Sequence, residues 1–256
     1  MKFKLIAGVC VGCALMLSSG CVISVGSDFN TADVKLDERL ELDAEELTSF
    51  AVDTSVGDID IVGVEGQKQI VVLAKIRTTQ ARDYELGLEK RGTTAFLASH
   101  HSSQNGSWTA HPYIDLKVTM PADMALQVEQ RSGDMTIKDI NQSLKVKDRS
   151  GDLHIRNIGG MVDIEDRSGD LSIIDISDSA TIRDRSGDLL VRNIEGNVVI
   201  TDTSGDIEIF NAQGDVEIKD TSGDIDVHGA QSINVIEDGS GDLDYSNIES
   251  FIHQSR

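Results

Sequence analysis

The feature that most constrains the fold is a Ser-Gly-Asp tripeptide that recurs every 18 residues. Its seven aspartates are Asp134, Asp152, Asp170, Asp188, Asp206, Asp224 and Asp242. A fixed period of this length is typical of solenoids, in which each repeat forms one coil and packs against its neighbours. The sequence therefore predicts a stack of similar coils.

Apolar residues keep the same register and predict two short strands in each coil. In the coil that follows Asp152 they are Leu153, Ile155, Ile158, Val162 and Ile164. Spacings of two residues match a strand with one buried face, and the longer spacings mark corners. The last column of the pattern contains Val146, Ile164, Ile182, Ile200, Ile218 and Ile236. Because β-branched residues dominate, we expect an all-β solenoid (β-helix) whose coils stack about 4.8 Å apart.

Upstream of residue 126 the repeat is present only in weaker form. The tetrapeptide Ser-Val-Gly-Asp at residues 55–58 reads as a degenerate first coil, whereas residues 74–122 break the period. Ile114, Leu116 and Val118 alternate with polar residues and predict a strand there. We expect a β-rich module over residues 48–125 that caps the open end of the solenoid, which occupies residues 126–256.

The N-terminus has the pattern of an export signal. Lys2 and Lys4 precede an apolar run from Leu5 to Leu17, which is too short to span a bilayer comfortably. The Leu-Ser-Ser-Gly-Cys sequence at residues 17–21 resembles a bacterial lipobox, in which the signal peptide is cut before an acylated cysteine. We therefore assign residues 1–20 to a signal peptide, and an ordinary signal peptide followed by an incidental cysteine is the alternative.

Cys21 is the predicted lipidation site. It is the single cysteine outside the signal peptide, and acylation explains an unpaired cysteine in an oxidising compartment. Two or three acyl chains hold a protein on a membrane stably. Because Val22 follows the cysteine, the resemblance to Gram-negative lipoproteins favours the outer membrane. We expect a cell-envelope protein anchored to the membrane at Cys21, with residues 21–47 as a polar tether.

The charge balance restricts the partners. The chain has 23 Lys and Arg against 44 Asp and Glu, a formal net charge of −21. Nucleic-acid binding needs basic patches, so nucleic acid is not expected as a partner. An acidic surface suits cations, basic partners or solubility.

The order of these segments is similar to that of a known family. The strand predicted at residues 114–119, the Met120-Pro121 step and residues 126–134 lead into the Ser-Gly-Asp strands. This arrangement resembles the bacterial putative-adhesin family of β-strand-repeat domains of unknown function, over residues 48–250. The resemblance implies a β-solenoid and association with the cell envelope, and it supplies no catalytic residues.

The Ser-Gly-Asp corner has a structural role in this interpretation. Glycine tolerates the positive φ of a tight corner, and aspartate accepts hydrogen bonds from backbone N–H groups in turns. The first four copies are preceded by Arg131, Arg149, Arg167 and Arg185. We expect these arginines to form an alternating charge ladder with the carboxylates, which would otherwise repel one another.

The last three copies lack the arginine and suggest a metal hypothesis. The carboxylates without that basic partner are Asp202, Asp206, Asp220, Asp224, Asp238 and Asp242. Ca²⁺ prefers such oxygen ligands, so Ca²⁺ is the one cofactor to consider. The calcium-binding nonapeptide repeat does not fit, because it places a glycine turn about every nine residues.

We find no catalytic constellation in the sequence. His100, His101, His111 and Trp108 fall in or beside one predicted loop, where solvated side chains are more natural than a zinc site. The prediction is a non-enzymatic envelope lipoprotein, an adhesin or scaffold that binds a protein or glycan through its solenoid surface. The alternatives are a Ca²⁺-binding structural module and a polysaccharide-acting β-helix enzyme, which would need a carboxylate pair in a cleft.

Overall fold

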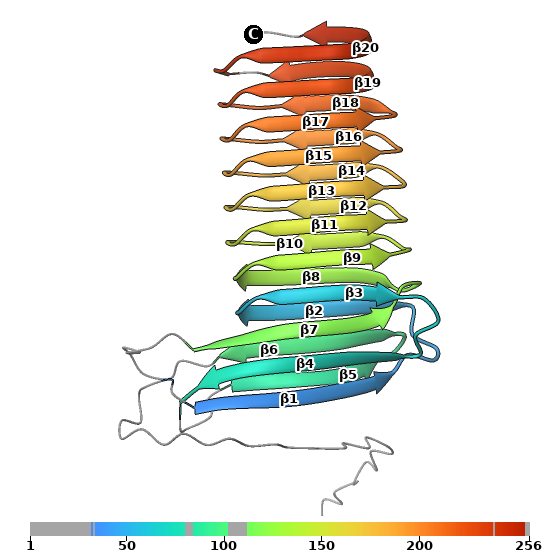
Figure 1. The fold of residues 1–256 in the computed structure, drawn as a ribbon, viewed down its shortest axis with the longest axis vertical. Coiled ribbons are helices and arrows are strands. Elements are labelled where there is room, and N and C mark those ends of the chain that lie inside the picture. Colours follow the sequence, from blue (N-terminus) through green and yellow to red (C-terminus); the bar gives the residue numbers. More distant parts are fainter. Residues whose placement is uncertain (1–31, 33, 80–83, 102–111, 238, 254–256) are drawn as a thin grey trace, which may run out of the picture.

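The computed structural model describes residues 32, 34–79, 84–101, 112–237 and 239–253. These residues form 20 strands, stacked one above another into a tall column (Figure 1). The prediction of an all-β solenoid is confirmed. Among the described residues there is no helix of the length and apolar character needed to cross a membrane.

The regular coils alternate between two faces of the column. Their strands are β8 (Ala125–Ser132), β9 (Met135–Ile140), β10 (Leu144–Lys147), β11 (Leu153–Ile158), β12 (Val162–Glu165), β13 (Leu171–Ile176), β14 (Ala180–Arg183), β15 (Leu189–Ile194), β16 (Val198–Thr201), β17 (Ile207–Ala212), β18 (Asp215–Lys219), β19 (Ile225–Glu237) and β20 (Leu243–His253). Odd-numbered strands up to β17 pair in parallel on one face, and even-numbered strands up to β18 on the other. Partners lie one period apart, as Leu153 does opposite Leu171. The longer β19 and β20 turn a corner and contribute to both faces.

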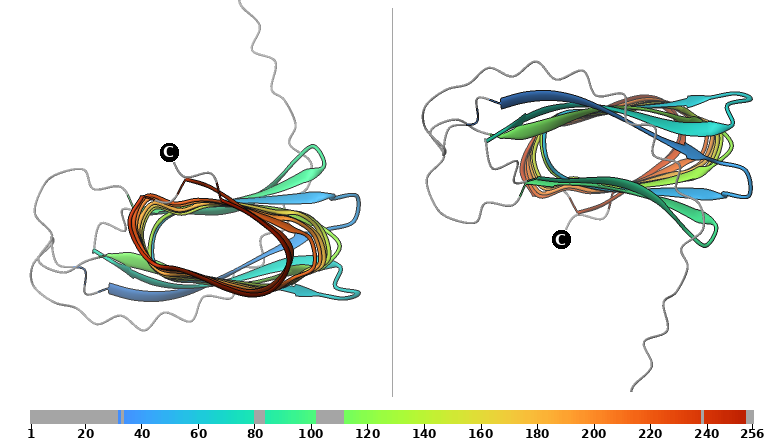
Figure 2. Two further views of the ribbon diagram at one scale, coloured as in Figure 1. Left: turned by 90° about the horizontal axis from the view of Figure 1, so that it is seen from above. Right: turned by 90° about the horizontal axis from the view of Figure 1, so that it is seen from below.

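The core is the interior of a flattened tube. Viewed along the column, the coils superimpose as an oval ring (Figure 2). The inward columns are nearly inaccessible to solvent, and Ile137, Ile173 and Ile209 are each 0% exposed. One coil is too thin to bury its own apolar residues, so each depends on the coils above and below it.

The degenerate copy at residues 55–58 forms the corner of a further coil. Its strands are β2 (Ser49–Val56) and β3 (Ile59–Val64). β2 pairs in parallel with β8, and β3 pairs in parallel with β9. The first coil is therefore formed by residues that lie 76 positions upstream of their partners in β8 and β9.

The remaining strands close the lower end of the column. They are β1 (Val34–Asp43), β4 (Gln69–Thr78), β5 (Tyr84–Arg91), β6 (Thr94–His101) and β7 (Tyr113–Pro121). β6 and β7 continue the parallel stack on β2 and β3, but β5 pairs antiparallel with β6, β4 with β7, and β1 with β4. This change of direction ends the repeat and covers the edge of the lowest coil (Figure 1).

One sequence prediction is wrong at this end. Residues 34–43, assigned to a polar tether, form β1 and pair along their length with β4. Val34 and Leu36 are buried, and Ala44 and Leu47 after the strand are buried as well. The alternating apolar residues of this acidic segment are a strand pattern, which its charge obscured.

A second correction concerns the last apolar column. The 18-residue pattern predicts that Ile236 points into the interior, but Ile236 is 36% exposed, and Val235 is fully buried instead. The cause is a register shift: Val235 pairs with Ile218, which is 17 residues earlier. This coil has therefore used one residue fewer than the 18-residue period up to Val235. A bulge beside Ile236 restores the register.

Candidate functional site

The Ser-Gly-Asp aspartates form a hydrogen-bonded column on the outside of one corner. Each Oδ1 accepts a hydrogen bond from the backbone N–H of the corresponding aspartate in the next coil, at 2.9–3.1 Å. The chain of contacts runs through Asp58, Asp134, Asp152, Asp170, Asp188, Asp206, Asp224 and Asp242. Backbone N–H groups therefore offset the repulsion between stacked carboxylates.

The predicted arginine ladder is absent. Within the described part of the chain, no ion pair involves Arg131, Arg149, Arg167 or Arg185. These side chains are exposed. Their backbone has the structural role instead, because Ser150 Oγ donates to the carbonyl of Arg131 at 3.1 Å and later serines repeat the contact. Since the aspartates accept backbone N–H groups, the column does not need the arginine charges.

A second aspartate column lies inside the tube. Its members are Asp148, Asp166, Asp184, Asp202 and Asp220, and none is more than 5% exposed. Asp166 and Asp184 each accept a hydrogen bond at Oδ1 from the next backbone N–H at 2.6 Å. Burial raises the pKa of Asp148 to about 7 and those of Asp184 and Asp202 to about 6, and it also raises the pKa of Asp166.

These five aspartates stand four residues before Ser-Gly-Asp aspartates, and two of them, Asp202 and Asp220, belong to the calcium hypothesis from the sequence. A signal for burial was present. Asp148 follows the buried Val146 by two residues, and side chains two apart on a strand point to the same side. Their charge was given more weight than this alternation.

The structure separates the carboxylates of the calcium hypothesis. Asp202 and Asp220 are buried, Asp206, Asp224 and Asp242 are exposed, and Asp238 lies outside the described residues. In the ranges that the structure describes, no group of three or more His, Cys, Asp or Glu side chains could hold a metal ion. Ca²⁺ binding thus stays a prediction from the sequence.

The opposite corner contains a ladder that sequence reasoning missed. At this corner Asp139, Asn157, Asp175, Asn193, Asn211 and Asn247 have positive φ values of 56–61°. Neighbouring side chains hydrogen-bond between coils, as Asn193 Nδ2 does to Asp175 Oδ1 at 2.8 Å. The sequence feature that could have revealed this ladder is a column of Asp and Asn residues that follows the 18-residue period. Apart from glycine, Asp and Asn are the residue types that best tolerate a left-handed backbone.

This ladder gives a direct prediction. Asn193→Ala should lower the free energy of unfolding by about 2 kcal/mol, because it adds left-handed strain and removes the hydrogen bonds to Asp175 and Asn211. Asn193→Gly should cost about 1 kcal/mol, since glycine removes only the hydrogen bonds. Urea unfolding of both variants measures the difference, and an alanine variant no worse than the glycine variant would contradict the role of φ.

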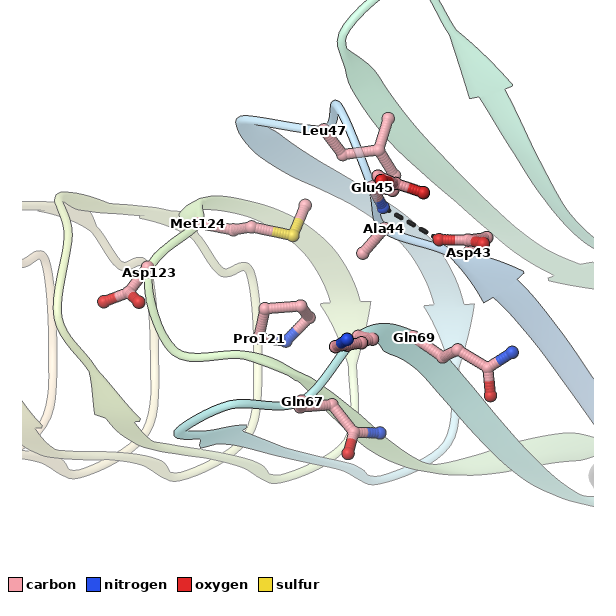
Figure 3. A pocket seen from close by; sticks show the side chains of 10 residues that line it. Asp43, Ala44, Glu45, Leu47, Gln67, Gln69, Pro121, Asp123 and Met124 are labelled. Carbon is pink, nitrogen blue, oxygen red and sulfur yellow. Dashed lines mark hydrogen bonds between the residues drawn. The ribbon is translucent and has the colours of Figure 1, made fainter.

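A cleft lies where the cap meets the first coils. Its volume is about 720 Å³, and its lining comes from the loops β1–β2, β3–β4 and β7–β8 together with the adjoining strand ends. Figure 3 shows Leu47, Ala44, Pro121 and Met124 around the centre of the cleft. The loops are fixed to one another, because Ala44 N–H donates to the Lys68 carbonyl at 2.9 Å and Ala122 N–H to the Val64 carbonyl at 3.2 Å.

The other sequence candidates do not form a site with these surfaces. His100 Nε2 lies 3.4 Å from Asp53 Oδ2, and the ring of His101 meets that of Tyr84 edge-on. Cys21, Trp108 and His111 lie outside the described residues.

Comparison with known proteins places this architecture among relatives. A family model described as Toastrack DUF4097 matches residues 115–252. A putative adhesin from Bacteroides fragilis has a similar solved structure, with 15% identity, coverage of 88% of this chain and 99% of that chain, and a TM-score of 0.56. A putative adhesin from Parabacteroides distasonis is 10% identical, with coverage of 90% of this chain and 100% of that chain and a TM-score of 0.40. No curated protein matches the chain.

Proposed function

Because the chain belongs to the Toastrack DUF4097 family, we propose that it is a non-enzymatic adhesin of the bacterial cell envelope. It binds a protein or glycan partner through the outer surface of its solenoid. The Bacteroides fragilis protein with a similar fold is described as a putative adhesin, which supports the proposal for this chain.

The observation that carries this proposal is the way the outer corners are built. Aspartate, asparagine and serine side chains at both corners bind the backbone or side chains of the adjacent coil. Such contacts fix the exposed columns before a partner arrives, so little conformational entropy is lost on binding. Solenoids use extended surfaces of this kind for recognition.

The experiment is a pull-down from isolated envelopes with the full chain as bait, with and without Ca²⁺. We expect a specific partner to be retained and recovered chemically intact. A partner retained only with Ca²⁺ would show that binding depends on Ca²⁺, as the calcium hypothesis predicts. Shortened glycan chains in the recovered material, lost on replacing paired aspartates, would contradict a non-enzymatic role.

The proposed location rests on residues 1–21. We propose that the signal peptide is removed before Cys21 and that the acylated cysteine holds the protein on the outer membrane. Cys21→Ser should abolish labelling by radioactive palmitate and release the protein from the membrane fraction, because no acyl chain is then attached. An unlabelled wild-type protein, or a serine variant that stays in the membrane, would contradict the anchor.

A further inference from the structure

The cleft at the junction of cap and solenoid has the composition of a binding site. Ala44, Leu47 and Met124 form a floor that is buried from bulk solvent. Gln67 and Gln69 also line the cleft. An apolar floor with a few polar groups around it, in a volume of several hundred Å³, is typical of sites for small ligands and short peptide segments.

The charges around this floor are unequal. Asp43, Glu45 and Asp123 contribute three carboxylates, and Lys68 contributes one ammonium group. All four residues are exposed. Asp43 Oδ1 accepts the Glu45 backbone N–H at 2.9 Å, and Asp123 Oδ1 accepts Asn141 Nδ2 at 2.9 Å, so both carboxylates keep a free oxygen direction for a cation.

The loop beside the cleft is held in an unusual conformation. Glu46 has a φ of +70°, whereas every other described non-glycine residue with positive φ is an Asp or Asn of the solenoid corners. The Glu46 side chain forms an ion pair with Lys90 of the cap strand β5, at 3.0 Å, and so it points away from the cleft. This conformation sets Glu45 and Leu47 on either side of Glu46 against the cleft.

We propose that this cleft binds a peptide segment in which a lysine or arginine stands next to an apolar residue. The apolar side chain enters the floor formed by Leu47 and Met124, and the basic groups lie against the carboxylates of Asp43, Glu45 and Asp123. Lys68 opposes this binding and limits its strength. The site is separate from the corner columns, so it adds a defined contact to the proposed binding function.

The test is calorimetric titration of the full chain in neutral detergent with the probe acetyl-Lys-Leu-Lys-amide. We expect saturable binding, and none with acetyl-Glu-Leu-Glu-amide. The variant Asp43→Asn, Glu45→Gln, Asp123→Asn should weaken binding about fivefold or more. The amides at positions 43 and 123 can still accept the hydrogen bonds from Glu45 N–H and Asn141. Lys68→Gln should strengthen binding about twofold, because it removes the opposing charge.

A matched control separates the cleft from the acidity of the whole chain. The variant Glu208→Gln, Glu217→Gln, Asp244→Asn removes three carboxylates from exposed strand positions remote from the cleft. It should change the affinity less than twofold. Equal losses in both triple variants, weaker binding after Lys68→Gln, or no binding of the basic probe would overturn the proposal. The purified components make such a failure distinguishable from failure of the adhesin role, which the envelope pull-down tests.

Discussion

Replacing Gly169 by alanine should lower the free energy of unfolding by about 3–5 kcal/mol. A Cβ at this position would lie 1.9 Å from the carbonyl oxygen of Gly151 in the preceding coil, and the backbone has a φ of +131°. The contact cannot be relieved by a side-chain rotation, because the Cβ position is fixed by its own backbone and the oxygen belongs to the backbone of the stacked coil. Urea unfolding followed by circular dichroism measures the loss.

Two other glycines separate the two causes. Gly66 has a φ of +69° with no neighbour near its Cβ position, so Gly66→Ala should cost about 1 kcal/mol from strain alone. Gly87 has neither feature, and Gly87→Ala should be close to neutral. If Gly169→Ala lowered the free energy of unfolding no more than Gly66→Ala does, the close contact between coils would not be the reason that this corner requires glycine.

The second large effect is a rise in stability as the pH falls from 8 to 5. The buried Asp184 and Asp202 have pKa values raised to about 6 by loss of water, compared with an ordinary value near 4. The folded chain therefore binds more protons than the unfolded chain in this window, and stability increases on acidification. With allowance for screening by solvent, we expect about 1 kcal/mol for each such carboxyl.

Single substitutions assign this pH dependence to the interior. Asp184→Asn should reduce the gain between pH 8 and pH 5 by about 1 kcal/mol, because asparagine does not titrate. Asp244→Asn changes the net charge equally at an exposed position and should leave the gain unchanged. An equal effect of both variants would show that the pH dependence comes from the net charge of the chain.

The fold was largely predictable because one period governs both the corners and the interior. Leu153 and Ile155 are buried as their alternation predicts, and their neighbours one period away are buried with them. Prediction failed where a local change interrupts this order. The shift at Ile236 depends on how β19 pairs with β18, which the residue pattern does not reveal. The strand at residues 34–43 has the alternating pattern, but its acidic charge obscured it.

The candidate sites were less predictable. Asp148 and Asp152 have the same side chain and lie four residues apart, yet the first is buried and the second is exposed. Asp148 continues the inward alternation of Val146, whereas Asp152 lies beyond the Ser-Gly corner, one residue before the inward-facing Leu153. The positive charge of the intervening Arg149 suggested an ion pair instead. The cleft was not predictable, because its three loops are distant in sequence and none contains a recognisable motif.

The most direct test of the central claim is equilibrium binding of the full chain, labelled and held in neutral detergent, to isolated envelopes from a strain that lacks the protein. We predict saturable binding that unlabelled protein displaces, with no release of glycan fragments over the course of the measurement. Binding that does not saturate, or release of glycan fragments in proportion to the added protein, would contradict a non-enzymatic adhesin.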